Sequence, residues 1–181
     1  MKDTLIIAGY PGVGKTCYNK NNIDRNCVIM DSDSSKFSWI LGEDGKPSPI
    51  KERNPKFPDN YINHIKEYVG RVDIIFVSTH KQVLQSLIDA GIQFYIIAPN
   101  ITEQMKDLYL TKYINRGSEF AFVKLMADKW EEFHIDIANF HTKYDIPVFY
   151  LNERTPHITK SIIEQIKTVH KIANHSIRKE D

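Results

Sequence analysis

Residues 9–16 read Gly-Tyr-Pro-Gly-Val-Gly-Lys-Thr, and residues 4–8 before them read Thr-Leu-Ile-Ile-Ala. The octapeptide matches the pattern G-x-x-x-x-G-K-[ST] in full. It follows an apolar run that predicts a buried strand, and it precedes a segment that predicts a helix, which is the context that makes the pattern specific. A strand, this turn and a helix together form the opening unit of an α/β sheet, so the stretch decides the fold class.

Short apolar runs recur along the rest of the chain, separated by segments of helical period. Including the first, five runs predict strands: residues 4–8, 27–30, 72–77, 94–98 and 147–151. They are apolar at successive positions and do not alternate, as expected of parallel strands covered on both faces by helices. We therefore expect an α/β fold, a three-layer α/β/α domain with a five-stranded parallel sheet.

The segments between these strands carry helix signals. Three residues are expected to cap helices: Asp59 before a helix to about Val69, Thr79 before residues 80–90, which Gly91 ends, and Thr102 before residues 103–115. Apolar residues at steps of three or four over residues 122–140 predict one core stripe on a long or broken helix. A similar stripe that includes Ile162, Ile166 and Ile172 predicts a closing helix over residues 158–173.

Composition limits the classes of function. The 181 residues, 41% of them hydrophobic, predict a single domain over residues 1–181. The 24 Lys and Arg nearly balance the 23 Asp and Glu, so the net charge of +1 gives no field to gather nucleic acid or a membrane surface. No apolar run is long enough to span a bilayer, and the two cysteines form no disulfide framework. We expect a cytoplasmic protein with no membrane partner.

The octapeptide predicts a nucleotide site. Its glycines allow backbone N–H groups to turn toward phosphate oxygens at the start of a helix. Lys15 is expected to neutralise the β and γ phosphates, and Thr16 to offer its hydroxyl to Mg²⁺. The predicted cofactors are ATP, or GTP in its place, and Mg²⁺; the alternative is a glycine-rich turn that matches by chance. The residues expected to bind the nucleotide are Gly9, Pro11, Gly12, Val13, Gly14, Lys15, Thr16 and Cys17.

Two carboxylates, Asp31 and Asp33, follow the second predicted strand within Asp-Ser-Asp-Ser-Ser. Ligand chemistry in open α/β sheets takes place at this carboxyl edge. Phosphoryl transfer needs a metal ligand and a group that orients the acceptor, and the two carboxylates could divide those roles. The alternative is an Asp/Ser-rich helix cap, and both descriptions can hold together.

With these motifs the chain resembles the P-loop kinases of small molecules, which include nucleoside monophosphate kinases, shikimate kinase, gluconate kinase and polynucleotide 5'-kinases. It is also similar to small phage and bacterial nucleotide-kinase-like proteins. The resemblance covers most of the chain in element order and implies the P-loop NTPase fold. By similarity to the D-x-D of shikimate-type members, Asp31 would serve Mg²⁺ and Asp33 would contact the acceptor.

The resemblance also implies a lid and a base site. Residues 102–130 would form the lid, with Arg116 as the first choice for a catalytic cation and Lys106 and Lys112 as further candidates. An ordinary solvated helix face is the alternative, and the segment carries fewer arginines than many relatives. In residues 152–156, Arg154 would stack on the adenine ring; the alternative is a turn built by its polar neighbours.

Other candidates lie along the same edge. After the third strand, His80 and Lys81 could contact phosphate or acceptor, or could lie exposed in a helix turn capped by Thr79. That strand ends without a carboxylate, since Asp73 stands near its beginning, which argues against a motor-type ATPase and places more weight on Asp31. Residues 41–58 carry glycines and prolines that predict an irregular acceptor-side loop. Second-rank acceptor contacts are Lys36, Phe37, Trp39, Lys51 and Arg53, with core packing as the alternative for the aromatics.

These features predict an ATP-dependent kinase that transfers a phosphoryl group to a small acceptor, a nucleoside or nucleoside monophosphate. In this reading Lys15, Asp33 and Arg116 are catalytic, and Thr16 and Asp31 hold the metal. A polynucleotide 5'-hydroxyl or a shikimate-like metabolite is the alternative acceptor, and no other nucleic-acid partner is expected. The rival class is a nucleotide-dependent switch or assembly module. No HExxH, zinc-type cysteine spacing or G-x-S-x-G elbow occurs, and the acceptor and oligomeric state stay open.

Overall fold

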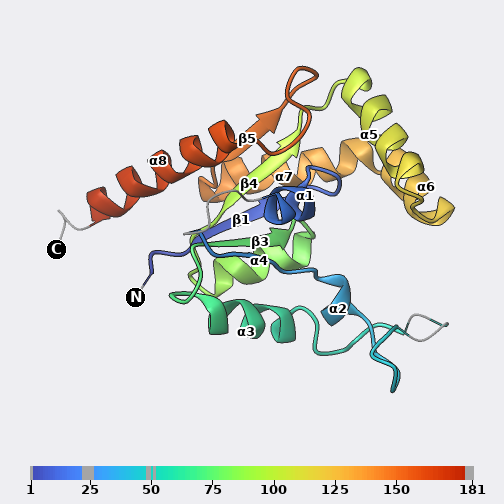
Figure 1. Ribbon diagram of the computed structural model, residues 1–181, viewed down its shortest axis with the longest axis horizontal. Helices are drawn as coiled ribbons and strands as arrows, with labels where there is room; N and C mark the ends of the chain where they lie inside the picture. The colour runs from blue at the N-terminus through green and yellow to red at the C-terminus, as the bar shows by residue number, and fades with distance from the viewer. Residues whose placement is uncertain (1, 22–26, 48–49, 51, 178–181) are drawn as a thin grey trace.

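One sheet of five parallel strands forms the centre of the molecule (Figure 1). The structure is a computed structural model that describes residues 2–21, 27–47, 50 and 52–177. Its strands lie in the order β2-β3-β1-β4-β5. They span Leu5–Gly9 (β1), Ile29–Asp31 (β2), Ile74–Ser78 (β3), Tyr95–Pro99 (β4) and Val148–Leu151 (β5). The predicted five-stranded parallel sheet is confirmed, with boundaries shifted by up to two residues.

Strand β1 lies at the middle of the sheet and is buried along its whole length. It pairs with β3 from Leu5 opposite Ile74 to Gly9 opposite Ser78, and with β4 on its other side. A continuous apolar run fits this place, because both faces of a central parallel strand are covered. The loop that follows Gly9 therefore leaves the carboxyl edge between two neighbouring strands.

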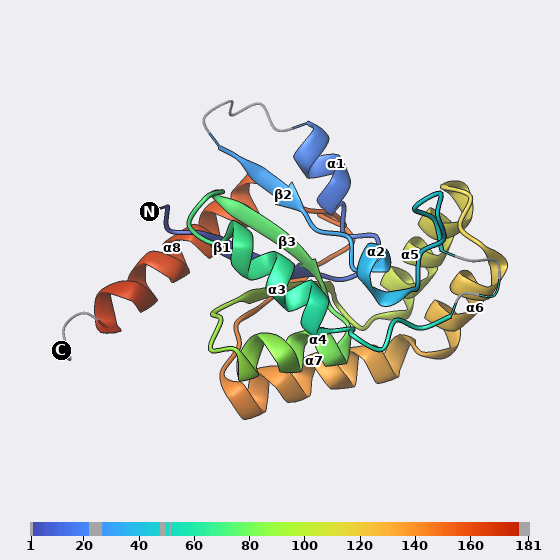
Figure 2. The same ribbon diagram turned by 90° about the horizontal axis from the view of Figure 1, so that it is seen from below.

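Eight helices accompany the sheet in the described part of the chain. They span Lys15–Lys20 (α1), Ser35–Ser38 (α2), Asp59–Tyr68 (α3), Lys81–Asp89 (α4), Glu103–Asn115 (α5), Phe120–Asp128 (α6), Trp130–Tyr144 (α7) and Lys160–Ile177 (α8). Figure 2 shows α1 and α8 on one face of the sheet and α3, α4 and α7 on the other, which makes three layers. Helices α2, α5 and α6 lie at the carboxyl edge (Figure 2). Among the described residues, no helix combines the length and apolar character needed to cross a bilayer.

Of the three predicted helix caps, one is confirmed. The Thr102 side chain accepts a hydrogen bond from the Met105 amide at 3.3 Å. Asp59 is already the first residue of α3, so its carboxylate lies in the first turn and the N-cap is Pro58. Thr79 is also not a cap, because the chain stays extended through His80 and α4 begins one residue later. Gly91 follows the end of α4 with a φ of 64°, as expected of a glycine after a helix.

The two predicted apolar stripes contribute to the core beside residues of α3, α4 and α5. The first is divided between α6 and α7 at Lys129, and it buries Met126, Trp130, Ile137 and Phe140. In the closing helix α8, Ile163 and Ile166 are buried, whereas Ile172 is 63% exposed. The prediction that Ile172 packs on the sheet was wrong, because the last turns of α8 extend beyond the strands (Figure 1).

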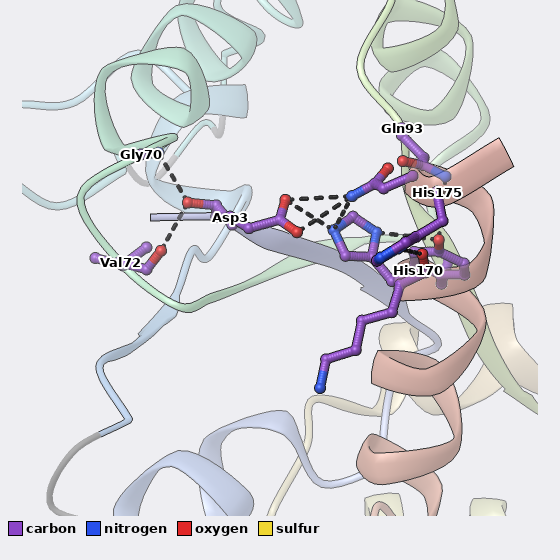
Figure 3. A network of polar contacts seen from close by, with 10 residues as sticks. Asp3, Gly70, Val72, Gln93, His170 and His175 are labelled. Carbon is purple, nitrogen blue, oxygen red and sulfur yellow. Dashed lines mark hydrogen bonds and ion pairs between the residues drawn. The ribbon is translucent and has the colours of Figure 1, made fainter. Parts of the chain in front are cut away.

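A polar network at the amino edge ties the start of the chain to α8 (Figure 3). His170 is buried, with Nε2 3.0 Å from the Asp3 carboxylate and Nδ1 3.1 Å from the Tyr95 hydroxyl. Gln93 in turn donates to the Tyr95 hydroxyl at 3.1 Å. Next to Asp3, the Thr4 hydroxyl donates to the Val72 carbonyl at 2.6 Å, which fixes the entry into β1. The network lies at the edge opposite residues 9–16, and it connects the chain before β1 and the start of β4 to α8.

Replacing Tyr95 by Phe should lower the free energy of unfolding by about 1–2 kcal/mol, because His170 Nδ1 then loses a buried hydrogen-bond partner. Tyr150→Phe is the matched control. The Tyr150 side chain is about half exposed, and its hydroxyl has no hydrogen-bond partner among the described residues. Urea unfolding of both variants measures the difference. Equal stability of the two would show that the network adds nothing.

Candidate functional site

Two glycines shape the loop that leaves β1. Gly12 has a φ of 85° and Gly14 a φ of 95°, both in the left-handed region that side chains disfavour. At Gly12 the space is closed as well, since a Cβ there would lie 2.8 Å from a ring carbon of Tyr113. The glycines are therefore required by backbone conformation at both positions and by close approach at the first.

The turn leaves several main-chain amides without a partner. In the described part of the chain, the N–H groups of Gly12 and of residues 14–17 donate to no other protein group. The Val13 amide differs, because it donates to the Tyr10 carbonyl at 3.2 Å and its side chain is buried in the core. Unpartnered amides gathered at one turn provide hydrogen bonds for an anion.

Lys15 points back across this turn. Its Nζ donates to the Gly9 carbonyl at 2.6 Å, so Gly9 contributes a resting contact for the lysine. Burial lowers the pKa of Lys15 to about 8, against the opposite influence of the Asp31 and Asp33 carboxylates. A phosphate at this position would favour the charged form, because an opposite charge nearby stabilises an ammonium group.

The turn opens into a pocket of about 540 Å³ at the carboxyl edge. Four parts of the chain line it. The loop and α1 contribute Pro11, Gly12, Gly14, Lys15, Thr16 and Cys17. The segment after β2 contributes residues 31–35, β3 and its end contribute Ser78 and His80, and the segment after β4 contributes Arg116 and Phe122. The structure thus brings most of the predicted site residues into one cavity.

The two residues predicted to hold the metal ion, Thr16 and Asp31, are in contact with each other. The Thr16 hydroxyl donates to the Asp31 carboxylate at 2.5 Å, and both residues line the pocket. Among the described residues, no group of three or more His, Cys, Asp and Glu side chains could hold a metal ion. Thr16 and Asp31 provide a hydroxyl and a carboxylate oxygen, which are ligand types that Mg²⁺ can take from a protein.

Asp33 lies one residue before Ser34, the N-cap of α2, and its contact with an acceptor stays a prediction. One carboxylate oxygen accepts the Ser35 amide at 2.9 Å in the first turn of α2, as a capping group does. The residue is exposed and lines the pocket, and its charge acts on Lys15. Asp33 thus combines a local turn contact with a place in the lining of the cavity.

Arg116 reaches the pocket from the end of α5. Its guanidinium lies 4.9 Å from the centre of the Tyr113 ring and 5.4 Å from that of Phe122, and its Nε donates to the Ser118 hydroxyl at 2.8 Å. No carboxylate lies within ion-pair distance of it in the part of the chain that the structure describes. Two rings hold the planar group while leaving its charge available.

Helix α5 also fastens the two loops that flank the pocket. The Tyr113 hydroxyl donates to the Pro11 carbonyl at 2.7 Å. The Tyr109 hydroxyl and the Lys112 ammonium both donate to the Pro156 carbonyl, at 3.0 Å and 2.6 Å. Lys112 is used in this contact and does not line the pocket, so its part as a lid cation stays a prediction. Lys106 does not line the pocket either.

The loop after β5 passes beside the phosphate loop. The Ile158 amide donates to the Val13 carbonyl at 2.8 Å, and the side chain of Asn152 accepts the amides of Arg154 and Thr155 at 3.0 Å each. Residues 152–155 therefore form the polar turn that was the alternative prediction for this loop. Arg154 is exposed and is not among the residues that line the pocket, so its contact with a base stays a prediction.

Of the two candidates after the third strand, only His80 lines the pocket. Desolvation and then the charges of Arg53 and Lys15 lower the pKa of His80 there. Lys81 instead forms an ion pair with Asp136 of α7 at 2.6 Å.

Phe37 packs against Tyr61 in the core. Arg53 lies over the Trp39 ring, 4.2 Å from its centre, next to the pocket. Lys36 is exposed and does not line the pocket, and Lys51 lies outside the described residues.

Five residues that line the pocket were given no role in the site: Ser32, Ser34, Ser35, Ser78 and Phe122. Phe122 was assigned to the apolar core stripe, and periodicity alone does not separate a ring that lines a cavity from one that fills a core. Ser78 was assigned no role, since a single serine at a strand end carries no motif. The signal for Ser78 is its place at the end of the third strand, because ligands of open α/β sheets bind at the carboxyl ends of the strands.

Nucleotide affinity should be constant below about pH 7 and fall as pH rises above about 8. Lys15 of the empty protein loses its proton in that range, whereas phosphate raises its pKa, so binding near pH 8–9 should take up a proton. Calorimetry in buffers of different ionisation enthalpy measures the uptake. Lys15→Ala should abolish it, and uptake that persists in this variant would assign the proton to another group.

Gly12→Ala should lower the free energy of unfolding by at least about 2 kcal/mol and remove Mg-ATP binding, because the methyl group adds a clash with Tyr113 to the cost of a positive φ. Gly91→Ala is the control, with a φ of 64° and no atom within 4 Å of the added carbon. Its cost should be about 1 kcal/mol, with binding intact. Chemical denaturation and calorimetry of both variants separate the clash from the backbone strain.

The chain was also compared with known proteins. The residues gathered at the carboxyl edge provide partner-free amides, a lysine, a hydroxyl and carboxylate pair and an arginine around one cavity. This set of groups can bind a polyphosphate with a divalent cation and can neutralise charge on it. Neither the protein-family models nor the curated protein sequences contain a match to this chain.

Proposed function

We propose that this protein is an ATP-dependent kinase that transfers the γ-phosphoryl group of Mg-ATP to a nucleoside or nucleoside monophosphate. One observation carries the proposal: the amides of the first turn, Lys15, Asp31, Asp33 and Arg116 converge on the same pocket of about 540 Å³. A chance match of the octapeptide gives no reason for these other groups to gather there. The strand order, with the phosphate loop between β3 and β4, places the pocket at the carboxyl edge where α/β proteins bind ligands.

On this proposal the phosphates lie over the unpartnered amides, and Lys15 leaves the Gly9 carbonyl to contact them. Thr16 and Asp31 would hold Mg²⁺, which supplies charge neutralisation across the phosphates when bound. Lys15 and Arg116 stabilise the charge that develops on the transferring group. Positioning and electrostatic stabilisation supply most of the catalysis in this chemistry.

The acceptor side is formed by Asp33 and the segment that follows it. An acceptor hydroxyl attacks the γ phosphorus, the bond from that phosphorus to the β–γ bridging oxygen breaks, and the hydroxyl proton passes to the Asp33 carboxylate. If the acceptor is a phosphate oxygen, no proton has to move and Asp33 only orients the acceptor. Arg53, fixed over Trp39 beside His80, adds a positive charge on this side that suits a phosphorylated acceptor.

A second candidate is a nucleotide-dependent switch. It is favoured by the contacts of α5 to both Pro11 and Pro156, since they connect the nucleotide loops to the lid helices. The absence of a carboxylate at the end of β3 fits either function. Turnover that saturates with one small acceptor supports the kinase. Turnover that requires a protein partner and no small acceptor supports the switch.

Incubation with Mg-ATP and a panel of nucleosides, nucleoside monophosphates, 5'-hydroxyl oligonucleotides and shikimate-like metabolites tests the proposal by detecting a phosphorylated product. Asp33→Asn should reduce kcat by about 10²–10⁴ for a hydroxyl acceptor while Mg-ATP still binds, because the proton acceptor is lost. Asp89→Asn, at the end of α4 and outside the pocket, is the control. A kinase assignment is wrong if no acceptor in the panel stimulates ATP turnover.

A further inference from the structure

Ser78 ends β3 directly opposite Gly9, the residue at which the chain turns into the phosphate loop. The residue lines the pocket, yet its hydroxyl oxygen is buried and has no hydrogen-bond partner among the described residues. Buried hydroxyls in folded proteins are nearly always hydrogen-bonded, and an exception calls for an explanation. A partner that is not part of the protein chain is one such explanation.

The register of the sheet shows on which face Ser78 lies. Asp31 of β2 pairs with Phe76 of β3, and side chains at paired positions point to the same face. Ser78 is two residues after Phe76 and therefore shares the face of Asp31. The ring of Tyr18 from α1 packs edge-on against that of Phe76, with 6.0 Å between the ring centres. This is therefore the face that α1 and the turn of residues 9–16 cover.

Ser78 thus lies on the same side of the sheet as the Thr16 and Asp31 pair. Ser32 provides a contrast from the same pocket. Its hydroxyl is also buried without a partner in the described part of the chain, but it is one residue after Asp31 and so belongs to the opposite face. There Tyr61 of α3 donates to the Ser32 carbonyl at 2.6 Å. Of the two hydroxyls, only that of Ser78 is on the metal side.

We propose that Ser78 is a positioning residue whose hydroxyl hydrogen-bonds to the hydrated magnesium ion of the bound nucleotide. This rests on the proposed function. A neutral hydroxyl suits the place, because Asp31 and Asp33 already put two negative charges near the phosphates. The hydroxyl can orient a metal-bound water without adding a third negative charge. The empty protein keeps an unsatisfied group there, and the loaded protein satisfies it.

The test measures ADP affinity by calorimetry, with Mg²⁺ and with EDTA, on the full chain and on Ser78→Ala, Ser78→Thr and Ser86→Ala. Ser78→Ala should weaken Mg-ADP binding about three- to tenfold and leave metal-free ADP binding unchanged, because only the magnesium complex uses the hydroxyl. Ser78→Thr keeps a hydroxyl and should restore most of the affinity. Ser86 lies on α4, outside the pocket, and should have no effect.

A second readout is the Tm of the empty protein. Ser78→Ala should leave it unchanged or raise it by a few degrees, at about 2–4 °C per kcal/mol, since the variant removes a buried group that has no partner. A lower Tm would show that Ser78 acts in the fold, and equal losses with and without Mg²⁺ would show that it does not act at the metal. Either result overturns the inference about Ser78 and leaves the proposed function untouched. If the unmodified chain binds no Mg-ADP, the proposed function fails as well.

Discussion

The pairing of β1 on both of its edges is the constraint on which the site depends. Because β3 and β4 bond to it from either side, the chain can leave β1 only at the carboxyl edge, between two neighbours that are themselves buried. The turn at Gly9 is therefore held over the ends of both strands. The segments after β2, β3 and β4 open at the same edge, so their side chains meet the turn in one pocket.

Charge in the pocket is balanced locally, as the near-neutral composition requires. Lys15, Arg116, Asp31 and Asp33 all line the cavity, and burial lowers the pKa of the lysine to about 8 in the empty state. Two carboxylates oppose the approach of a bare polyphosphate. The arrangement therefore favours an anion that carries a divalent cation over one that does not.

Much of the fold and part of the site could be predicted from the sequence, and the reasons are local. Buried parallel strands are apolar at every position, so runs such as residues 4–8 and 94–98 identified them. The octapeptide fixed the position of the turn, and the rule that parallel strands end at one edge brought Asp31 to it.

The sequence could not give the partners of long side chains or the position of every cap, because these depend on neighbours in three dimensions. Lys112 and Lys81 are long enough to reach several partners, and the structure gives them Pro156 and Asp136. Phe122 lies on the predicted apolar stripe and packs against the core, and it also lines the cavity. Thr79 has the chemistry of a cap, but the extended backbone at His80 delays the helix. Sequence patterns specify chemistry and period, whereas the partner of a flexible side chain is decided by packing.

The contacts of α5 carry a mechanical consequence. One helix holds the carbonyl of Pro11 through Tyr113 and the carbonyl of Pro156 through Tyr109 and Lys112. The distance between these two loops is thus held by side chains one helical turn apart on α5, together with the direct hydrogen bond from the Ile158 amide to the Val13 carbonyl. A tilt of α5 would therefore displace both loops together, so movements on the two sides of the pocket are coupled through one rigid helix.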